Sequence, residues 1–523
     1  MIPNPVISNR KRLAGGLMSF RLFDIREAWN MKYAVDSKMA EYIDKYTIED
    51  MGVPSIVLME RAALSVAGKV AEVAVNFNHE VKIVAVCGVG NNGADGIAAA
   101  RILSWQGLKV DIVIVGDEAK ATREFLEQKA IAERSGMRFG NISSIKEYVI
   151  IIDAIFGVGL SRNIEGEYAE AIEEINAGNS YVVSVDIPSG ISASNGAVLG
   201  TAVEADSTVT FGYHKIGMLL YPGKEYAGEV TVSDIGFNPN AVSKINPAMY
   251  FVQEDIGRIP KRLTYSNKGT YLRALIIAGN EDMSGAAYLS GAAAYRCGVG
   301  LVEIFTHCNN TEVLKRNLPE AIVTGYNEEN AKELLEGKLE KADVIIIGPG
   351  LGTSNTSKEL LDMVIKSAKV PLIIDADGLN ILAANKAVLK SYPSTVIITP
   401  HIGEMARLTN MDKQDILKDI IGTAQKFSDE YNVICVLKDA ASVVTEPQTG
   451  RVYINNSGCG AMSKAGCGDV LTGVIAAMLA LRIEPFSAAA MGVYIHGLAG
   501  EKATVGINEH SLMASDLIYF LLN

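Results

Sequence analysis

The sequence predicts an α/β protein of two domains, each built on a mostly parallel sheet with helices on both faces. Short apolar runs alternate with helical patterns along most of the chain, which is typical of strand–helix–strand units. The length of 523 residues exceeds the roughly 250–300 at which a single core stops growing. The Asn-, Pro- and Gly-rich stretch 236–248 interrupts the alternation, and we place the domain boundary there.

The amino-terminal domain is expected over residues 31–240. A helical pattern begins near Met31 and is broken before Pro54, and a second helix is expected over residues 55–75. The expected strands span residues 81–87, 110–115, 148–153, 181–186, 207–211 and 229–233. A glycine turn and a helix follow the first of these strands, and this order predicts a Rossmann-like, doubly wound sheet.

The carboxyl-terminal domain is expected over residues 250–523. The strand–helix alternation restarts there, but no motif of the first half recurs, so the chain is not an internal duplication. The expected strands span residues 272–278, 299–305, 344–347, 372–375, 396–399 and 433–437. The pattern again predicts a mostly parallel sheet with helices on both faces.

Charge and cysteine usage narrow the class of protein. The formal net charge of −12 argues against nucleic acid as a partner, because phosphate backbones are bound by clustered Lys and Arg. No apolar run reaches the ~18 residues of a membrane span, and no secretory signal is recognisable. The six cysteines form no Cys-x-x-Cys pair, so we expect free thiols in the reducing cytoplasm. The Arg-rich residues 1–30 are expected to form a disordered extension; a transit peptide and a translation start placed too early are the alternatives.

The first chemical signal is the loop at residues 88–96, between an expected strand and a helix. Its start fits the dinucleotide fingerprint G-x-G-x-x-G, although a sharp turn without any ligand fits the glycines as well. The loop also carries Asn91, Asn92 and Asp95, where an ordinary dinucleotide loop has small apolar residues. Carboxamides and a carboxylate supply the oxygen ligands that a cation beside a polar ligand needs.

Two further acids follow strands of the same expected sheet. Asp153 ends one strand and Asp186 ends another, and each precedes a turn that contains glycine. Ligands of doubly wound sheets bind at the carboxyl ends of the strands, so three polar turns are expected to meet in one crevice. A single acid at a strand end is usually a helix cap, but three together favour a binding site.

These motifs resemble the YjeF N-terminal family, the NAD(P)H-hydrate epimerases. The matching pieces are GNNGADG at 90–96, DAIFGVGL at 153–160 and VDIPSG at 185–190, and the resemblance extends over residues 31–234. It implies that Asn92, Asp153 and Ser189 bind K⁺ and that Asp186 transfers a proton during epimerisation. It also implies contacts to the hydrated nucleotide from Asn91, Asn92, Gly93, Ala94, Asp95, Gly157, Val158, Gly159, Leu160, Ser161, Arg162, Asn163 and Asp186.

One position of this first site departs from the family pattern. The family usually has glycine where Ala94 stands. We expect alanine to be tolerated there unless the position requires a positive φ.

The second chemical signal is the glycine-rich run at residues 456–473, which leads into an apolar helix. Backbone N–H groups of residues 466–469 can form an anion nest at the helix N-terminus, which suits a phosphoryl group in transfer. Asp469 can take a proton from a hydroxyl nucleophile, although a plain helix cap is the alternative. Further small or charged turns follow the strands at residues 280–287, 348–352, 375–380 and 399–404.

Together these turns resemble the YjeF C-terminal family, which has the ribokinase-like fold and dehydrates NAD(P)H hydrates at the expense of ADP or ATP. The resemblance spans residues 254–523 and implies that Asp469 is the base and that Mg²⁺ accompanies the nucleotide. The residues implied to contact the hydrate are Ala286, Gly350, His401 and Asp469. The residues implied to bind the adenine nucleotide are Lys438, Asp439, Ala440, Ala441, Ser442 and Gly468.

Three positions of this second site depart from the family pattern. Asn267 replaces a histidine, Asp439 replaces a glycine and Cys467 replaces a threonine. The resemblance nevertheless implies a bifunctional repair enzyme that acts on NADHX and NADPHX and assembles as a homo-oligomer, a tetramer. The alternatives are a ribokinase-like small-molecule kinase, a dehydrogenase that uses the first loop, and a non-catalytic nucleotide-binding protein.

Overall fold

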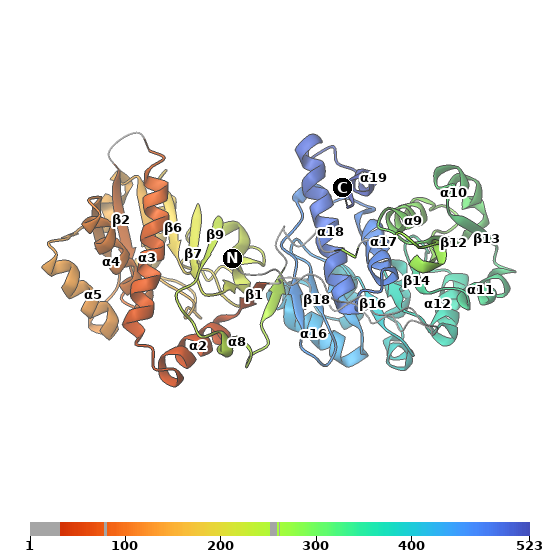
Figure 1. Ribbon diagram of the computed structural model, residues 1–523, viewed down its shortest axis with the longest axis horizontal. Coiled ribbons are helices and arrows are strands. Elements are labelled where there is room, and N and C mark those ends of the chain that lie inside the picture. Colours follow the sequence, from red (N-terminus) through yellow and green to blue (C-terminus); the bar gives the residue numbers. More distant parts are fainter. Residues whose placement is uncertain (1–31, 78–80, 251–258, 261, 523) are drawn as a thin grey trace.

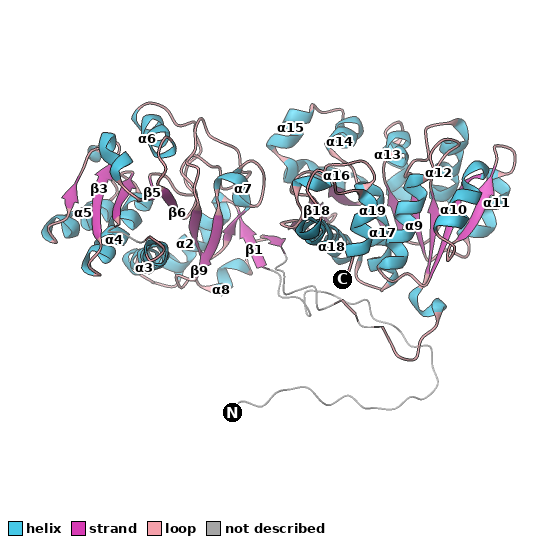
Figure 2. Cartoon of the chain, turned by 90° about the horizontal axis from the view of Figure 1, so that it is seen from above, coloured by secondary structure: helices cyan, strands magenta, loops and turns pink. Residues whose placement is uncertain are grey.

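The computed structural model describes residues 32–77, 81–250, 259–260 and 262–522, so the extension expected at residues 1–30 lies outside the described residues. The chain forms two lobes (Figure 1), and both have the α/β architecture that the sequence predicts. Seen from above, helices flank the sheet of each lobe (Figure 2). Within the described residues, no helix is both long and apolar enough to cross a membrane.

The amino-terminal lobe contains a sheet of seven strands, all parallel. Their order is β4 (Arg138–Phe139), β3 (Lys109–Ile114), β2 (Lys82–Cys87), β5 (Ile150–Ala154), β6 (Tyr181–Val185), β7 (Ser207–Phe211) and β9 (Glu229–Ser233). Because β2 lies between β3 and β5, the chain winds outward in both directions from this point, and a doubly wound sheet binds its ligands at such a place.

Alternate residues of the central strands face opposite layers of helices. Ile83 and Ala85 pack in one cluster, and Val84 and Val86 pack in another, as the two-residue period of a strand requires. The first cluster includes α3 (Ser55–Ala74), α4 (Asn91–Trp105) and α5 (Arg123–Arg134), and the second includes α6 (Glu167–Asn176). Both faces are buried, so the strands are almost wholly apolar.

The carboxyl-terminal sheet is parallel from β13 to β17 and then turns antiparallel. Its strands are β13 (Ile322–Tyr326), β12 (Leu301–His307), β11 (Arg273–Ile277), β14 (Val344–Ile347), β15 (Leu372–Ile374), β16 (Val396–Ile398), β17 (Ile434–Leu437), β18 (Val443–Thr445) and β19 (Val452–Ile454). The sequence pattern missed β13, β18 and β19. The last two are only three residues long, which is too short to show a period.

Helices cover both faces of this second sheet. One face packs against α9 (Gly285–Arg296), α17 (Cys467–Ala480), α18 (Pro485–Gly506) and α19 (Ala514–Phe520). The other packs against α11 (Ala331–Leu339), α12 (Asn355–Ser367), α13 (Asp377–Leu382), α14 (Ile402–Thr409) and α16 (Ile420–Tyr431). Helix α13 begins just after β15, α14 begins just after β16, and α17 begins within the glycine-rich run. Anions bind readily at such helix N-termini.

Three short strands join the two lobes. β10 (Ala248–Tyr250) pairs with β19 on one side and with β1 (Lys32–Val35) on the other, and β1 also pairs with β8 (His214–Lys215). The helix that the sequence predicts from Met31 is therefore wrong for residues 32–35, and helix α2 begins only at Ser37 (Ser37–Lys45). A four-residue strand whose partners lie far along the chain leaves no local signal.

Candidate active sites

A cavity of about 960 Å³ opens at the carboxyl edge of the amino-terminal sheet. It brings together most of the residues that the sequence assigns to the hydrated nucleotide. Those that line it are Asn91, Asn92, Asp95, Gly157, Val158, Gly159, Leu160, Ser161, Arg162 and Asp186. Gly93, Ala94 and Asn163 do not line it. Gly93 and Ala94 are buried in the first turn of α4, and Ala94 has helical φ, so alanine is accommodated where the family has glycine.

Asp186 stands at the end of β6 in a left-handed conformation, with φ of 66°. Its Oδ1 accepts hydrogen bonds from the Lys215 Nζ at 2.7 Å, from the Phe211 N–H at 3.1 Å and from the Thr210 hydroxyl at 3.1 Å. A non-glycine residue in this region is strained, and such strain is concentrated where surrounding contacts fix a functional group. The contacts therefore hold the carboxylate in one orientation at the cavity wall.

Lys215 is one residue of this site that sequence reasoning missed, and Asp44 is another. Lys215 is 2% exposed and lines the same cavity from β8, and its ammonium also donates to the Thr210 hydroxyl at 2.9 Å and to the Phe211 carbonyl at 3.1 Å. A buried ammonium needs both a counter-charge and hydrogen-bond acceptors, and Asp186 supplies the counter-charge. The two-residue strand that carries Lys215 gives no recognisable motif.

Two further acids, Asp95 and Asp44, line the same cavity as Asp186. Burial, followed by repulsion from Asp186 and Asp44, raises the pKa of Asp95 well above its ordinary value. Burial and Asp186 also raise the pKa of Asp44, which lies on α2 and lines the cavity. Crowded carboxyl groups resist simultaneous ionisation, so a proton is readily retained among them.

Asp153 and Ser189 lie fully buried beside this cavity. Asp153 accepts hydrogen bonds from the hydroxyls of Ser189 at 2.6 Å and Ser184 at 2.7 Å. No ion pair involves Asp153 among the described residues, and burial raises its pKa. The Asn92 amide nitrogen is buried without a hydrogen-bond partner, and a Cβ placed on Gly157 would meet the Asn92 Oδ1 at 3.0 Å. A buried carboxylate without a cation, next to hydroxyl, carboxamide and carbonyl oxygens, fits a hard monovalent cation.

The described residues contain no group of three or more His, Cys, Asp or Glu side chains arranged to hold a metal ion. The residues that the sequence assigns to K⁺ are of a different kind, because two of the three offer neutral oxygens.

The second site lies at the amino-terminal end of α17. Gly466 precedes the helix with φ of 93°, and Asp469 sits half-buried in its first turn. Burial, and then repulsion from Asp375, raise the pKa of Asp469 to about 7, although Lys438 opposes the shift. A carboxyl group with a pKa near neutrality can both take up and release a proton at physiological pH.

Lys438, which the sequence assigns only to nucleotide binding, also lies beside the residues that surround Asp469. Its Nζ pairs with the Asp375 Oδ1 at 2.7 Å, and a Cβ placed on Gly468 would meet that Nζ at 3.2 Å. Asp375 is buried at the end of β15 and was not among the predicted site residues, although it begins the turn 375–380. Lys438, Asp375 and Gly468 thus form one cluster with Asp469.

The remaining predicted residues of this site divide into two groups. A Cβ placed on Gly350 would meet the Ala286 Cβ at 3.0 Å, so these two lie side by side. His401 pairs with Lys438 through a β-bridge, and its Nδ1 accepts a hydrogen bond from the Gly403 N–H at 2.9 Å. Burial and neighbouring cations lower the pKa of His401, and its accepting Nδ1 is that of a neutral ring.

The residues of the loop after Lys438 differ in how far they are exposed to solvent. Asp439 and Ala440 are exposed, whereas Ala441 is buried, and the Ser442 hydroxyl donates to the Asp439 carbonyl at 3.4 Å. Burial raises the pKa of Asp439.

Two of the positions that depart from the family pattern lie in different surroundings. Cys467 is 7% exposed and belongs to an apolar cluster under α17. Asn267 is exposed and caps a short helical turn, Lys268–Tyr271, by accepting a hydrogen bond from the Gly269 N–H at 2.9 Å.

Each domain has one acidic site at the carboxyl edge of its α/β sheet. Together the fold and the two sites define a two-domain enzyme that binds a polar small molecule in each domain. Known families match both halves. Residues 55–217 match the family described as YjeF-related protein N-terminus, and residues 274–519 match the family described as NAD(P)H-hydrate dehydratase.

Full-length relatives match the chain as a whole. A bifunctional NAD(P)H-hydrate repair enzyme Nnr from Thermofilum pendens is 34% identical, over 94% of this chain and 95% of the relative. Another from Moorella thermoacetica is 33% identical, over 94% and 96%. Among solved structures, the ADP/ATP-dependent NAD(P)H-hydrate dehydratase from Bacillus subtilis has a sequence 33% identical to the matched part of this chain. The match covers 52% of this chain and 95% of the dehydratase, with a TM-score of 0.47.

The chain belongs to the bifunctional NAD(P)H-hydrate repair enzymes. It is an enzyme that combines NAD(P)H-hydrate epimerase and NAD(P)H-hydrate dehydratase activities, and so restores damaged nicotinamide nucleotides. This confirms the function that the sequence motifs imply and sets aside the kinase, dehydrogenase and non-catalytic alternatives.

Proposed function

We propose that Asp186 transfers the proton in epimerisation, with Lys215 as the residue that holds its carboxylate in place. The observation that carries this assignment is the 2.7 Å ion pair between them at the wall of the 960 Å³ cavity. Epimerisation at the hydrated ring carbon can pass through ring opening or loss of hydroxide. Both routes need a proton to be moved, and a carboxylate within reach can move it. The polar residues of the loops 91–95 and 157–163 would contact the hydrated nucleotide.

We also propose that Asn92, Asp153 and Ser189 hold K⁺. The fully buried carboxyl of Asp153, the Ser189 hydroxyl that contacts it at 2.6 Å and the Asn92 Oδ1 beside Gly157 support the site, because all three offer oxygen ligands. When bound, the cation would neutralise Asp153 beside the anionic substrate.

Exchange of K⁺ for a much larger organic cation should therefore destabilise the amino-terminal domain. We expect the melting temperature of the full chain in potassium buffer to exceed that in tetramethylammonium buffer of equal ionic strength, because binding to the folded state stabilises it by mass action. The difference should vanish in Asp153→Asn. Equal melting temperatures for the unchanged chain in the two buffers would argue against the site.

In the second domain we propose that Asp469 is the base that activates the hydrate hydroxyl. Asp469 takes the hydroxyl proton as the oxygen attacks the terminal phosphoryl group of ADP or ATP, and the nest at the start of α17 receives the transferred group. Inorganic phosphate then leaves together with a ring proton, which restores the dihydropyridine. AMP or ADP is the other product.

The nucleotide would bind along Lys438, Asp439, Ala440, Ala441, Ser442 and Gly468, and the hydrate would contact Ala286, Gly350 and His401. Mg²⁺, when bound, would neutralise the nucleotide phosphates. The carboxylates of Asp375 and Asp377, which act electrostatically on Asp469, are oxygen donors of the kind that Mg²⁺ prefers.

The pKa of Asp469 predicts the pH dependence of dehydration. Because a base must be deprotonated and the pKa is raised to about 7, kcat/KM for the (S)-hydrate should rise with pH and level off above that value. At pH 6, one unit below the pKa, about one tenth of Asp469 is deprotonated, so kcat/KM should be about one tenth of its plateau value. Initial rates of NADH formation from pH 5.5 to 8.5 measure this. A flat profile would argue against Asp469 as the base.

We further propose that the two activities divide at the expected boundary, residues 31–240 and 250–523, and that the enzyme works as a homo-oligomer, a tetramer, in the cytoplasm. The six free cysteines support a reducing compartment. The family resemblance supports the oligomer.

A further inference from the structure

The junction between the two domains reaches the loop that leads to Asp469. Lys224 belongs to the amino-terminal domain, in the short helix α7 (Gly223–Tyr226), and its Nζ donates a hydrogen bond to the Asn456 carbonyl at 3.2 Å. Asn456 begins the glycine-rich run 456–473 of the dehydratase domain. A side chain of one domain therefore contacts the catalytic loop of the other.

The surroundings of Lys224 make this contact stronger than an ordinary surface hydrogen bond. The side chain is half-buried, and its ammonium lies 5.6 Å from the centre of the Tyr221 ring. Burial lowers its pKa, and the carboxylate of Glu501 opposes that shift. A hydrogen bond from a charged donor in partly desolvated surroundings contributes more than a neutral one.

The segment that Lys224 contacts is also held by residues of the dehydratase domain. Glu501, on α18, accepts a hydrogen bond from the Gly458 N–H at 2.7 Å. Between them, the Ser457 hydroxyl donates to the Tyr494 carbonyl at 2.9 Å. Lys224 is thus the member of this set that comes from the epimerase domain, and it fixes the point where β19 passes into the loop.

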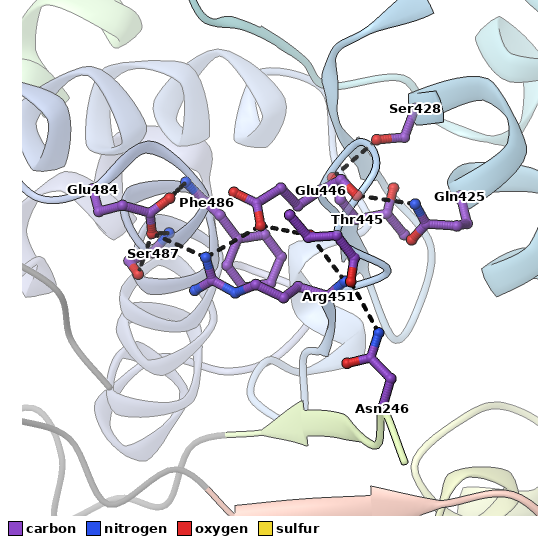
Figure 3. A network of polar contacts seen from close by, with 10 residues as sticks. Asn246, Gln425, Ser428, Thr445, Glu446, Arg451, Glu484, Phe486 and Ser487 are labelled. Carbon is purple, nitrogen blue, oxygen red and sulfur yellow. Dashed lines mark hydrogen bonds and ion pairs between the residues drawn. The ribbon is translucent and has the colours of Figure 1, made fainter. Parts of the chain in front are cut away.

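A continuous sheet supports the same junction. β19 ends at Ile454, and it pairs with β10, which pairs with β1, which pairs with β8. Arg451 precedes β19 and is held by Glu446 at 3.2 Å and by Glu484 at 3.6 Å, while its guanidinium lies 4.2 Å from the centre of the Phe486 ring. Figure 3 shows this network above the strands of the junction. The strand that leads to Asn456 is therefore fixed both by its pairing with β10 and by the contacts of Arg451.

We propose that Lys224 is a positioning residue of the dehydratase, contributed by the epimerase domain. It holds the start of the glycine-rich loop so that the nest and Asp469 meet the phosphoryl group and the hydrate hydroxyl. This role rests on the function proposed above for that loop. It goes beyond that function because it makes dehydration depend on a residue outside the dehydratase domain.

The test compares Lys224→Met and Lys224→Arg in the full chain, with the (S)-hydrate of NADH, ADP or ATP, and Mg²⁺. We expect Lys224→Met to lower dehydratase kcat/KM about tenfold, mainly through a higher KM for the nucleotide, because a charge-assisted hydrogen bond is lost. Lys224→Arg should retain most of the activity. The epimerase rate and the pH midpoint of dehydration should stay unchanged, because neither Asp186 nor Asp469 is altered.

Asn246→Ala is the matched control. Asn246 (Figure 3) also contacts the dehydratase domain, but its Nδ2 donates to the Thr449 carbonyl at 3.1 Å, in the turn before β19 and not in the glycine-rich loop. We expect its dehydratase kinetics to match those of the unchanged chain.

Two outcomes would overturn the role of Lys224. One is Lys224→Met dehydration within twofold of the unchanged chain; the other is an equal loss of both activities with a lower melting temperature, which would indicate a general structural role. Failure of the proposed function is distinguishable, because the unchanged chain itself would then regenerate no NADH.

Discussion

Asp469→Asn should abolish nucleotide-dependent regeneration of NADH from its (S)-hydrate and leave epimerisation intact. Asparagine keeps the size and one oxygen of the side chain but cannot take up the hydroxyl proton, and loss of a positioned general base costs about 10²–10⁴-fold in rate. Steady-state NADH absorbance measures dehydration, and epimer ratios by chromatography measure epimerisation.

Asp362→Asn provides the matched control for this variant. Asp362 is exposed on α12, where it pairs with Lys366 four residues on, and such surface pairs contribute little to stability. Its dehydration rate should equal that of the unchanged chain. Dehydration by Asp469→Asn within tenfold of the unchanged rate would mean that another group is the base.

The converse result is expected for Asp186→Asn. Epimerisation should fall by about 10²–10⁴-fold, because the carboxamide cannot carry the proton. Dehydration of the pure (S)-hydrate should continue at the unchanged rate, because that chemistry occurs in the other domain. In a mixture of hydrates the (R) form should therefore remain unconverted after the (S) form is consumed.

Folding must be checked in this variant, since Lys215 is buried and would lose its counter-charge. Circular dichroism and the melting temperature provide that check. The control is Asp50→Asn, an exposed position of the same domain that lies outside the cavity lining. If Asp186→Asn folds and still interconverts the epimers at the unchanged rate, the assignment of the proton-transfer residue is wrong.

The sequence predicts most of the strands because they are buried on both faces. Runs such as Ile150–Ala154 and Val344–Ile347 consist almost entirely of apolar residues, and parallel strands between two helical layers require this composition. The acids that follow them are equally visible, since a carboxylate directly after an apolar run is rare unless it caps a helix or binds a ligand. Asp186 could be found in this way, whereas Asp469 was indicated by the glycine-rich run that leads into its helix.

The parts that could not be predicted depend on contacts between segments far apart in the chain. β1, β8 and β10 have two to four residues each and gain their structure only from one another and from β19. Lys215 acquires a role only because β8 brings it to Asp186, and Asp375 only because β17 ends where Lys438 can pair with it. Pairings of this kind leave no periodic or motif signal in a single sequence.

The most direct test of the two-site enzyme is the recovery of NADH from a mixture of its (R)- and (S)-hydrates by the purified full chain, with ADP or ATP and Mg²⁺. We expect complete recovery, with inorganic phosphate released in equal amount, because the epimerase converts the (R) form into the form that the dehydratase consumes. Absence of recovery with either nucleotide, or recovery that stops when the (S)-hydrate is exhausted, would contradict it.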